Sequence, residues 1–420
     1  MKTKIMRKLT IILVCLAHFQ ALSQDPVDPY LALAAANNPG LKARFSNFMA
    51  SLELIPQAKG LPDPKLTFGL FIQPVETRVG PQRASLALSQ SFPWFGTLKS
   101  RKNVACQIAE AKLMAFQDEK LKLFTEIRVA YNGLYYLHQA VRLTEENLQV
   151  LSSFKEIARV NFEGGKTGFV NVLRVEMEEE ELRAKLAFLQ DSQRSALVAF
   201  ENQLNAKIQT PLEFPDYLTL IPLNNQGQAL ADSMIAKNLQ LQELKYQVLA
   251  KEDQIKVAQM MSRPSFTVGL SYIFVDERSD VELPDNGQNA LLFPQVGMSI
   301  PIFQKKYQAL QNQANLEKER IQYQLEDKTN QLSSQLEFLV MDHLDAKRRN
   351  KLYRHLHDLA NRSLSLLLTE FTTGQTDFEE VLRMERKLLT YQLEYEKAQV
   401  DINNAVYKIN YLVGNEKDQY

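Results

Sequence analysis

The sequence predicts a mainly helical chain that is built from two internal repeats, each with a long helical hairpin and a pair of β-strands. Proline is absent between Trp94 and Thr210 and again after Pro301, so two long tracts can form uninterrupted helices. Four short segments outside these tracts alternate apolar and small polar residues with the period of two that is typical of strands. A segment rich in Gly and Thr interrupts each helical tract, and its two copies lie about half a chain length apart.

The N-terminus has the pattern of a secretory signal peptide over residues 1–23. Basic residues precede an apolar run, Leu9 to Phe19, that is too short to span a membrane as a mature helix, and a small-residue cleavage site follows before Gln24. The apolar run contains Cys15, but the residue before it is not the small one of a lipoprotein signal, so we do not expect lipidation. The mature chain then keeps one thiol, Cys106, and no internal disulfide.

Charge and hydropathy limit the partners of the chain. Acidic and basic residues balance at 49 each, so no net charge favours nucleic acid as a partner. The mature sequence has no run of about 18 apolar residues, so we expect no transmembrane helix. Because lipid requires every backbone polar group to be paired, any part of this chain that enters a membrane is expected to do so as a β-barrel.

The first repeat is expected over residues 24–210. It contains, in order, a helix with an Asn-Asn-Pro-Gly interruption, two strands, a long helix, a tight turn and a return helix. The expected bounds are about 28–57 for the first helix, 65–72 and 83–92 for the strands, 97–162 for the long helix and 162–168 for the turn.

The second repeat is expected over residues 224–413, after a proline-rich linker at 211–223, and a polar tail at 414–420 follows it. The elements come in the same order as in the first repeat. The expected bounds are about 227–261 for the first helix, 265–274 and 295–300 for the strands, and 371–377 for the turn that ends the second long helix.

All four predicted strands have one apolar face and one face of small polar residues. This alternation is typical of a membrane barrel, in which apolar side chains face lipid and small polar ones face a lumen. A soluble sheet that packs on helices alternates in the same way and is the alternative. Because the smallest barrels have about eight strands, a barrel built from this chain would be shared between several copies.

The two turns share the pattern Phe-x-x-Gly-x-Thr-x-Phe-x-x-Val-Leu, which begins at Phe162 and at Phe371. Together with the duplicated strand pairs and the long hairpins, this pattern resembles the outer-membrane efflux protein family, the TolC-like channels of tripartite efflux systems. The resemblance covers nearly the whole mature chain. The segment from Phe92 to Gly96 is similar to that of the metal-cation efflux branch of the family.

The resemblance implies a homotrimer, in which three chains form a 12-stranded β-barrel in the outer membrane that an α-helical barrel continues into the periplasm. It implies a passive exit duct for substrate that an inner-membrane pump, of the RND type, delivers through a periplasmic adaptor protein. The alternative is a periplasmic coiled-coil adaptor or a structural protein without a channel. We expect no enzyme, cofactor or metal site, because the chain contains no P-loop, G-x-S-x-G or Cys-x-x-Cys motif.

The resemblance also assigns residues to functional positions. The tips that dock onto the adaptor in this family are here Gly165, Lys166, Thr167, Gly168, Gly374, Gln375, Thr376 and Asp377. The periplasmic gate is assigned to Asn171, Arg174, Glu380 and Arg383. Some family members carry two Asp residues past the second tip, so Glu380 and Arg383 depart from that pattern. We expect ion pairs between these two residues, contributed by three chains, to hold the entrance shut.

Local structure is the simpler role for several turn residues. Thr167 and Thr376 are expected to cap the returning helices, and the glutamates from 176 to 181 are expected to form a solvated helix face. The side chains expected to anchor the turns by packing are Phe169, Val172, Leu173, Phe378, Val381 and Leu382.

Three aromatic residues, Phe92, Trp94 and Phe95, end the second predicted strand and precede the first long helix. Side chains of this kind suit an aromatic belt at a membrane–water interface. They suit a hydrophobic staple at the start of a helix equally well, so both interpretations stay open.

Overall fold

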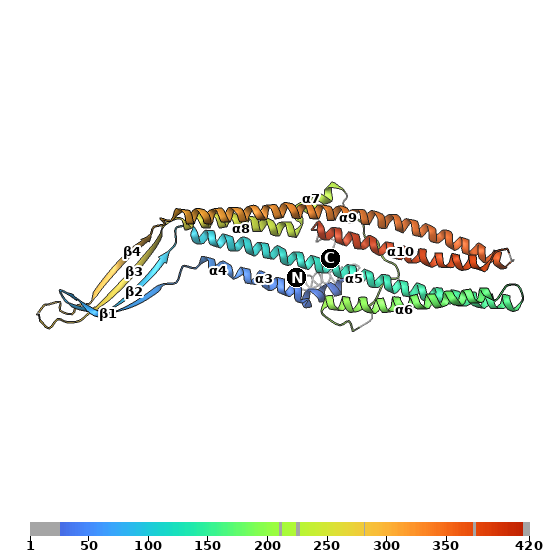
Figure 1. The fold of residues 1–420 in the computed structure, drawn as a ribbon, viewed down its shortest axis with the longest axis horizontal. Helices are drawn as coiled ribbons and strands as arrows, with labels where there is room; N and C mark the ends of the chain where they lie inside the picture. The colour runs from blue at the N-terminus through green and yellow to red at the C-terminus, as the bar shows by residue number, and fades with distance from the viewer. Residues whose placement is uncertain (1–25, 210–211, 224–226, 281, 373–374, 415–420) are drawn as a thin grey trace, which may run out of the picture. The chain divides into compact units, whose positions relative to one another are not determined.

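A computed structural model gives the fold of this chain (Figure 1). The predicted signal peptide, most of the predicted polar tail and Gly374 lie outside the residues that the structure describes. The described residues are 26–209, 212–223, 227–280, 282–372 and 375–414.

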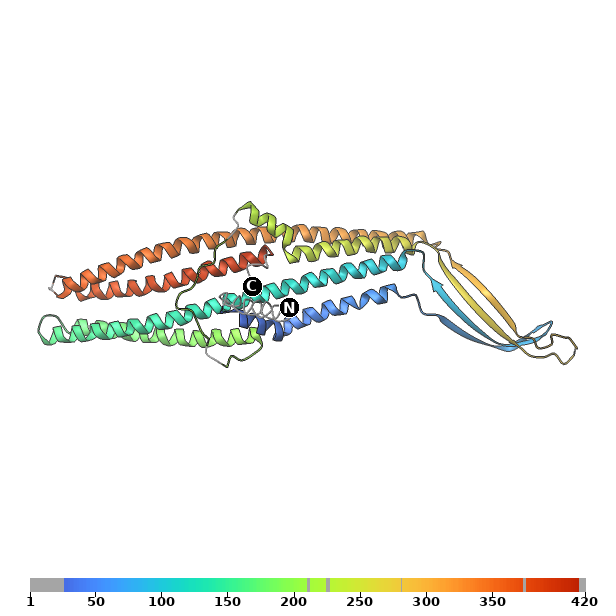
Figure 2. The same cartoon turned by 180° about the vertical axis from the view of Figure 1, so that it is seen from behind.

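The described chain is mostly helical with one small antiparallel sheet, so the fold class expected from the sequence is confirmed at this level. In Figures 1 and 2, α5 and α6 run side by side as one hairpin, and α9 and α10 run side by side as a second. The helices are α2 (Asp28–Asn37), α3 (Pro39–Leu52), α4 (Leu54–Lys59), α5 (Thr97–Glu163), α6 (Val170–Leu204), α7 (Gln228–Lys237), α8 (Leu239–Met261), α9 (Gln304–Thr372) and α10 (Phe378–Leu412).

The chain divides into two compact units. The strands belong to the unit formed by residues 43–117 and 239–330. Both hairpin turns belong to the other unit, which is formed by residues 1–42, 118–238 and 331–420.

The two helices that open the repeats are each broken at an asparagine, although we expected the second, over 227–261, to be continuous. Asn38 and Asn238 have extended backbone, and each uses its side chain to hold the end of a return helix. Asn38 Nδ2 donates to the Gln203 carbonyl at 3.0 Å, and Asn238 Nδ2 donates to the Leu412 carbonyl at 2.9 Å. The last carbonyls of a helix lack partners within it, so this contact satisfies one of them in each repeat.

The sheet has the strand order β1-β2-β3-β4, and all neighbours are antiparallel. Its central pair joins the two repeats, because β2 belongs to the first repeat and β3 to the second. In the sequence, α5, α6, α7 and α8 lie between these two strands. The strands are β1 (Lys65–Thr77), β2 (Gly80–Phe92), β3 (Ser265–Val275) and β4 (Ala290–Ser299).

The strands extend further at their loop ends than the predicted 65–72, 83–92 and 295–300. The β1–β2 ladder shifts register between Leu70 and Val75 and then continues until Thr77 pairs with Gly80. Pro74 and Pro81 lie within β1 and β2, because a proline that donates no ladder hydrogen bond is tolerated in an edge strand or beside a bulge. The fourth strand begins at Ala290 because its ladder with β3 continues past a second register shift.

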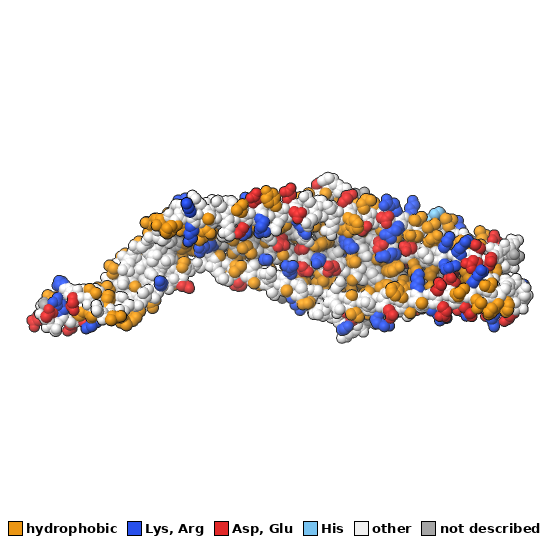
Figure 3. All heavy atoms as spheres, viewed as in Figure 1, with side chains coloured by type: hydrophobic (Ala, Val, Ile, Leu, Met, Phe, Trp, Pro, Cys, Tyr) orange, Lys and Arg blue, Asp and Glu red, His pale blue; other side chains and the backbone are white. Residues whose placement is uncertain are grey.

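One face of the sheet is apolar across all four strands. Phe68 pairs with Leu86, Leu86 pairs with Tyr272, and Tyr272 pairs with Leu291. Within the single chain, Phe68 and Leu291 are well exposed and Leu86 and Tyr272 are partly exposed, while Ile72 is 97% exposed. Figure 3 shows hydrophobic side chains along the strands and charged side chains at their loop ends and over the helices. The opposite face carries small residues, such as Thr67, Ala87 and Ser271.

The hairpins pack around a continuous apolar core that all four long helices line. At the turn end this core holds Phe154 of α5, Val172 of α6, Phe371 of α9 and Phe378 of α10. In α5, Ile127, Leu134, Thr144 and Leu151 recur at helical spacing and are buried. Burial of large side chains of this kind is the main favourable contribution to the packing of the two hairpins.

The role of Asn38 is open to measurement. The Asn38 side chain makes two contacts. Its Nδ2 donates to the Gln203 carbonyl, and its Oδ1 accepts from the Leu41 backbone N–H at 3.0 Å, at the start of α3. We expect Asn38→Ala to destabilise both helix ends by about 1–2 kcal/mol. Amide hydrogen exchange over 39–42 and 200–205 would then accelerate about five- to thirtyfold. Asn37→Ala is the matched control, and an equal acceleration in that variant would contradict the assignment.

Candidate functional site

The first hairpin turn is closed by backbone hydrogen bonds around a glycine. Gly165 has φ +71°, a conformation that residues with a side chain rarely adopt. The Lys166 N–H donates to the Asn161 carbonyl at 2.9 Å, and the Gly165 N–H donates to the Phe162 carbonyl at 2.9 Å. The bond from Lys166 to Asn161 satisfies a carbonyl at the end of α5. It forms only if the residue between them at 165 takes a positive φ, which explains why the first repeat has a glycine there.

The second turn repeats the same closure. The Gln375 N–H donates to the Glu370 carbonyl at 2.9 Å, and these two residues are five positions apart, as Lys166 and Asn161 are. Gly374 itself is not among the described residues. The predicted tip residues from 165 to 168 and from 375 to 377 therefore lie at the ends of the two hairpins of one unit.

The threonines do not cap the returning helices, so this expectation is wrong. Asp377 is the N-cap of α10, and its side chain accepts from the Glu379 N–H at 3.1 Å. In the first turn, Phe169 holds the N-cap position without a side-chain bond, and the buried Thr167 Oγ1 has no hydrogen-bond partner among the described residues. A carboxylate is the better cap because it also interacts favourably with the positive end of the helix dipole.

The anchoring side chains divide into two groups. Phe378, Val381, Leu382 and Val172 are buried as expected, whereas Phe169 and Leu173 are 50% and 44% exposed. The difference arises because Phe378 lies between the two hairpins. Its ring centroid is 4.8 Å from that of Phe371 and 6.1 Å from that of Phe154. Phe169 instead packs on Phe162 within its own hairpin, at 5.2 Å.

The predicted gate residue Arg174 connects the two turns. Its guanidinium lies 3.5 Å from the Asp377 carboxylate and 3.3 Å from the Glu379 carboxylate, both on the second hairpin. Arg174 Nη1 also donates to the Asn171 Oδ1 at 3.2 Å. Asn171 is buried and holds Arg174 in place, and the sequence alone did not indicate this arrangement.

Glu380 and Arg383 form an ion pair with each other on one face of α10. They are three residues apart, which places them one above the other on a helix. The Arg383 side chain is 56% exposed and that of Glu380 is 37% exposed, so the pair can be reached by solvent or by another chain. The structure therefore brings the predicted gate residues into two neighbouring groups, one that joins the turns and one on the surface.

A second ion pair joins the hairpins about two turns further along α10. Arg386 lies 3.2 Å from the Glu178 carboxylate and 3.5 Å from the Glu379 carboxylate. Glu178 is 16% exposed, and burial raises the pKa of its carboxyl above the ordinary value. Glu179 is buried and lies 3.3 Å from Lys155. The glutamates from 176 to 181 therefore do not form the uniformly solvated face that we expected, because this part of α6 faces two other helices.

The aromatic segment before α5 packs on the sheet. The Trp94 ring stacks on Phe266 of β3 at 5.9 Å, and Phe95 lies 6.0 Å from Trp94. Phe95 is 78% exposed. Exposed apolar side chains occupy the corresponding positions of the second repeat, at Ile300, Ile302 and Phe303.

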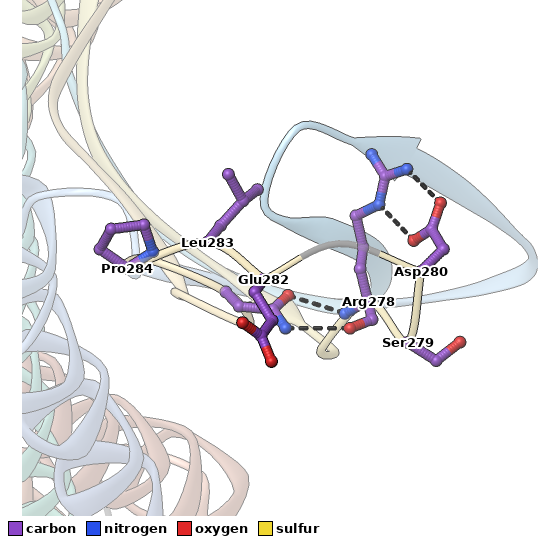
Figure 4. A pocket seen from close by; sticks show the side chains of 7 residues that line it. Arg278, Ser279, Asp280, Glu282, Leu283 and Pro284 are labelled. Atoms are coloured by element: carbon purple, nitrogen blue, oxygen red, sulfur yellow. Dashed lines mark hydrogen bonds and ion pairs between the residues drawn. The ribbon is translucent and has the colours of Figure 1, made fainter.

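The loop between β3 and β4 contains a hollow of about 550 Å³ that is lined by Arg278, Asp280 and Asn286, among others. Figure 4 shows the Arg278 and Asp280 side chains pointing toward one another. Their nearest atoms lie 2.6 Å apart, and Asn286 Oδ1 accepts from the Arg278 backbone N–H at 2.8 Å. These polar groups bond to one another within the loop. Their role in the loop is therefore to stabilise its conformation.

Two further searches covered only the described residues. No group of three or more His, Cys, Asp or Glu side chains there is arranged to hold a metal ion. In the same part of the chain, no helix has a stretch that is long and apolar enough to cross a membrane.

The cap on α10 generates a prediction. Asp377→Ala removes the acceptor for the Glu379 N–H, so we expect a loss of about 1 kcal/mol at the start of α10. Amide exchange over 378–381 would then be about fivefold faster. Asp377→Asn should keep most of the protection, because asparagine also caps helices. Thr376→Ala is the control, and an effect of that variant equal to that of Asp377→Ala would contradict this assignment.

Comparison with known proteins gives a family for the chain. The family model described as outer membrane efflux protein matches residues 30–206 and 230–415, one match for each repeat. A search of curated protein sequences found no match.

Solved structures of low sequence identity have the same fold. The transmembrane channel protein CusC superimposes with a TM-score of 0.78 at 16% identity, over 94% of this chain and 95% of CusC. The outer membrane protein VceC from Vibrio cholerae has a TM-score of 0.74 at 16% identity, over 92% and 96% of the two chains. The MtrE outer membrane channel of Neisseria gonorrhoeae has a TM-score of 0.73 at 16% identity, over 92% and 88%. Because the family model covers both repeats, the chain belongs to the outer membrane efflux protein family and is an efflux channel of the outer membrane, as expected from the sequence.

Proposed function

We propose that three copies of this chain form the exit duct of a tripartite efflux system. The observation that carries the proposal is the four-stranded sheet, which has one exposed apolar face and two unpaired edges, β1 and β4. An unpaired backbone group in lipid costs several kcal/mol, so such edges require partners there. Three sheets joined edge to edge make a 12-stranded barrel, within the range of known membrane barrels.

The small residues on the opposite face support the same arrangement. In a closed barrel this face would line the lumen, where Thr67, Ala87 and Ser271 leave space for substrate. The exposed aromatic residues Trp94 and Phe95, together with Phe92, would lie at the membrane–water interface. The exposure of Phe95 favours this belt over a helix staple, in which the side chain would be covered.

The long hairpins would continue the barrel into the periplasm as a helical tube. At about 1.5 Å per residue, α5 with its 67 residues extends roughly 100 Å. The turns, at the end of the tube away from the outer membrane, would dock onto a periplasmic adaptor that connects the duct to an inner-membrane pump of the RND type. Lys166 and Gln375 are exposed at these tips and are available for that contact.

We further propose that the turns form the gate of the closed duct. Arg174, supported by Asn171, would keep the two hairpins of one chain together through Asp377 and Glu379. Glu380 and Arg383 would face the entrance and pair with their counterparts in neighbouring chains. Each ion pair is partly exposed and contributes roughly 0.2–1 kcal/mol, so the gate would open for a modest change in adaptor binding.

One experiment tests the channel itself. The full chain is purified from membranes and analysed by gel electrophoresis with and without heating, and its single-channel conductance is measured in lipid bilayers. We expect a trimer band that heating converts to monomer, together with discrete conductance steps. A protein that stays monomeric and never conducts would contradict the proposal.

The gate generates a second prediction. We expect Arg174→Ala, Glu380→Ala and Arg383→Ala each to raise the resting conductance, by about two- to fivefold for the loss of up to 1 kcal/mol. Arg183→Ala is the matched control, because the exposed Arg183 pairs with Glu180 within its own helix. Unchanged resting current in all three gate variants, or an equal increase in the control, would argue against this location of the gate.

The docking surface generates a third prediction. A photoreactive amino acid that replaces Lys166 or Gln375 should cross-link to an adaptor protein in intact cells. Mass spectrometry of the cross-linked product would identify that adaptor. The control position is Arg194, an exposed residue on α6 outside the turns. Adaptor cross-links at Arg194 but not at either tip would place the docking surface elsewhere on the hairpins.

A further inference from the structure

A cavity of about 250 Å³ lies between α5, α6 and α10, beyond the gate residues along the hairpins. Both hairpins line it, because α5 and α6 belong to the first and α10 belongs to the second. The cavity is large enough to hold ordered water. Its polar and charged lining includes Asn147 of α5, Glu178, Glu181 and Lys185 of α6, and Glu385 and Arg386 of α10.

Glu385 is the most buried carboxyl of this lining, at 4% exposure. Its Oε1 accepts from Asn147 Nδ2 of the other hairpin at 2.6 Å. Its Oε2 is buried, and no described residue provides a hydrogen-bond partner for it. An ionised carboxylate normally accepts several hydrogen bonds, so a buried oxygen without a donor disfavours the charged form.

The charges around the cavity do not compensate a negative charge on Glu385. The α6 helix contributes Glu178, Glu181 and Lys185, and α10 contributes Arg386, which already pairs with Glu178. The lining residues of α5 are Asn147 and Leu151, neither of which is charged. Burial raises the pKa of the Glu385 carboxyl, and the single bond from Asn147 opposes this only in part.

We propose that Glu385 is a proton-binding site that fastens α10 to α5 while it is neutral and loosens the two hairpins when it ionises. When Glu385 is protonated, Oε1 keeps the bond from Asn147, and the buried Oε2 carries no charge that needs a donor. When Glu385 is ionised, Oε2 carries charge without a donor, and it gains solvation only if α10 moves away from α5 and α6.

The direction of the pH effect follows from linkage. The packed hairpins bind the proton more tightly than separated hairpins, in which the carboxyl is solvated and has its ordinary pKa. The contribution to packing is therefore complete below that ordinary pKa and is lost as the pH rises through the raised value. Because the gate lies on the same helices, this inference rests on the proposed function: the resting duct should become leakier in the alkaline direction.

The first test uses the full-length channel in lipid bilayers. Resting conductance is measured against pH for the wild type, Glu385→Gln and Glu181→Gln. We expect an alkaline increase in the wild type that is lost in Glu385→Gln, because glutamine keeps the acceptor for Asn147 and cannot ionise. Glu181, an exposed carboxyl of the same cavity, should retain the wild-type profile when it is changed to Gln. An unchanged alkaline increase in Glu385→Gln would overturn the proposal.

The second test does not require conduction. Infrared spectra of the full chain are recorded against pH, and the carbonyl stretch of protonated carboxyl groups is followed. We expect part of this band to persist to a higher pH than that of the exposed carboxyls and this part to be smaller in Glu385→Gln. Loss of the proposed channel activity at every pH would overturn the proposed function alone, whereas identical infrared titrations of the two proteins would overturn the proton site.

Discussion

The unpaired edges of the four-stranded sheet are the constraint on which the rest of this molecule depends. Among the described residues, β1 and β4 each have one side of their backbone without a neighbouring strand, and lipid cannot supply hydrogen bonds. The proposed shared barrel would resolve this, since the same sheet would then be repeated around an axis and pair edge to edge. The exposed apolar face, with Ile72 almost fully accessible, supports the same proposal, because lipid would cover it in such a barrel.

Duplication explains how one chain forms such a sheet. Each repeat contributes one strand pair, and β2 meets β3 although the first hairpin and the linker lie between them in sequence. The repeats also share the asparagine that holds the end of the return helix, at Asn38 and Asn238. They differ at the turns, where α10 has the carboxylate cap of Asp377 and α6 begins without a side-chain cap.

The hairpins are joined near their turns by contacts of different strength. Phe378 fills the apolar space between Phe154 and Phe371, and this burial provides stable packing. Arg174 and Arg386 connect the hairpins through partly exposed ion pairs, which contribute little each. A stable core next to weak, separable links would suit the proposed gate, which would have to stay closed and yet open when a partner binds. The proton on Glu385 would add control by pH to the same interface.

The helical hairpins, the strand alternation and the duplicated turn patterns were determined by the sequence itself, because helix breakers and periodicity act locally. Strand ends were less predictable, since the ladder around Pro74 and Pro81 continues through long-range pairing.

The candidate site also has features that the sequence predicts and features that it does not. Gly165 is required by its own backbone conformation, so sequence reasoning located the turn. Only tertiary structure decided that Arg174 reaches Asp377 and that Glu385 is buried beside Asn147. Those contacts join segments that are distant in the chain, where local pattern carries no information.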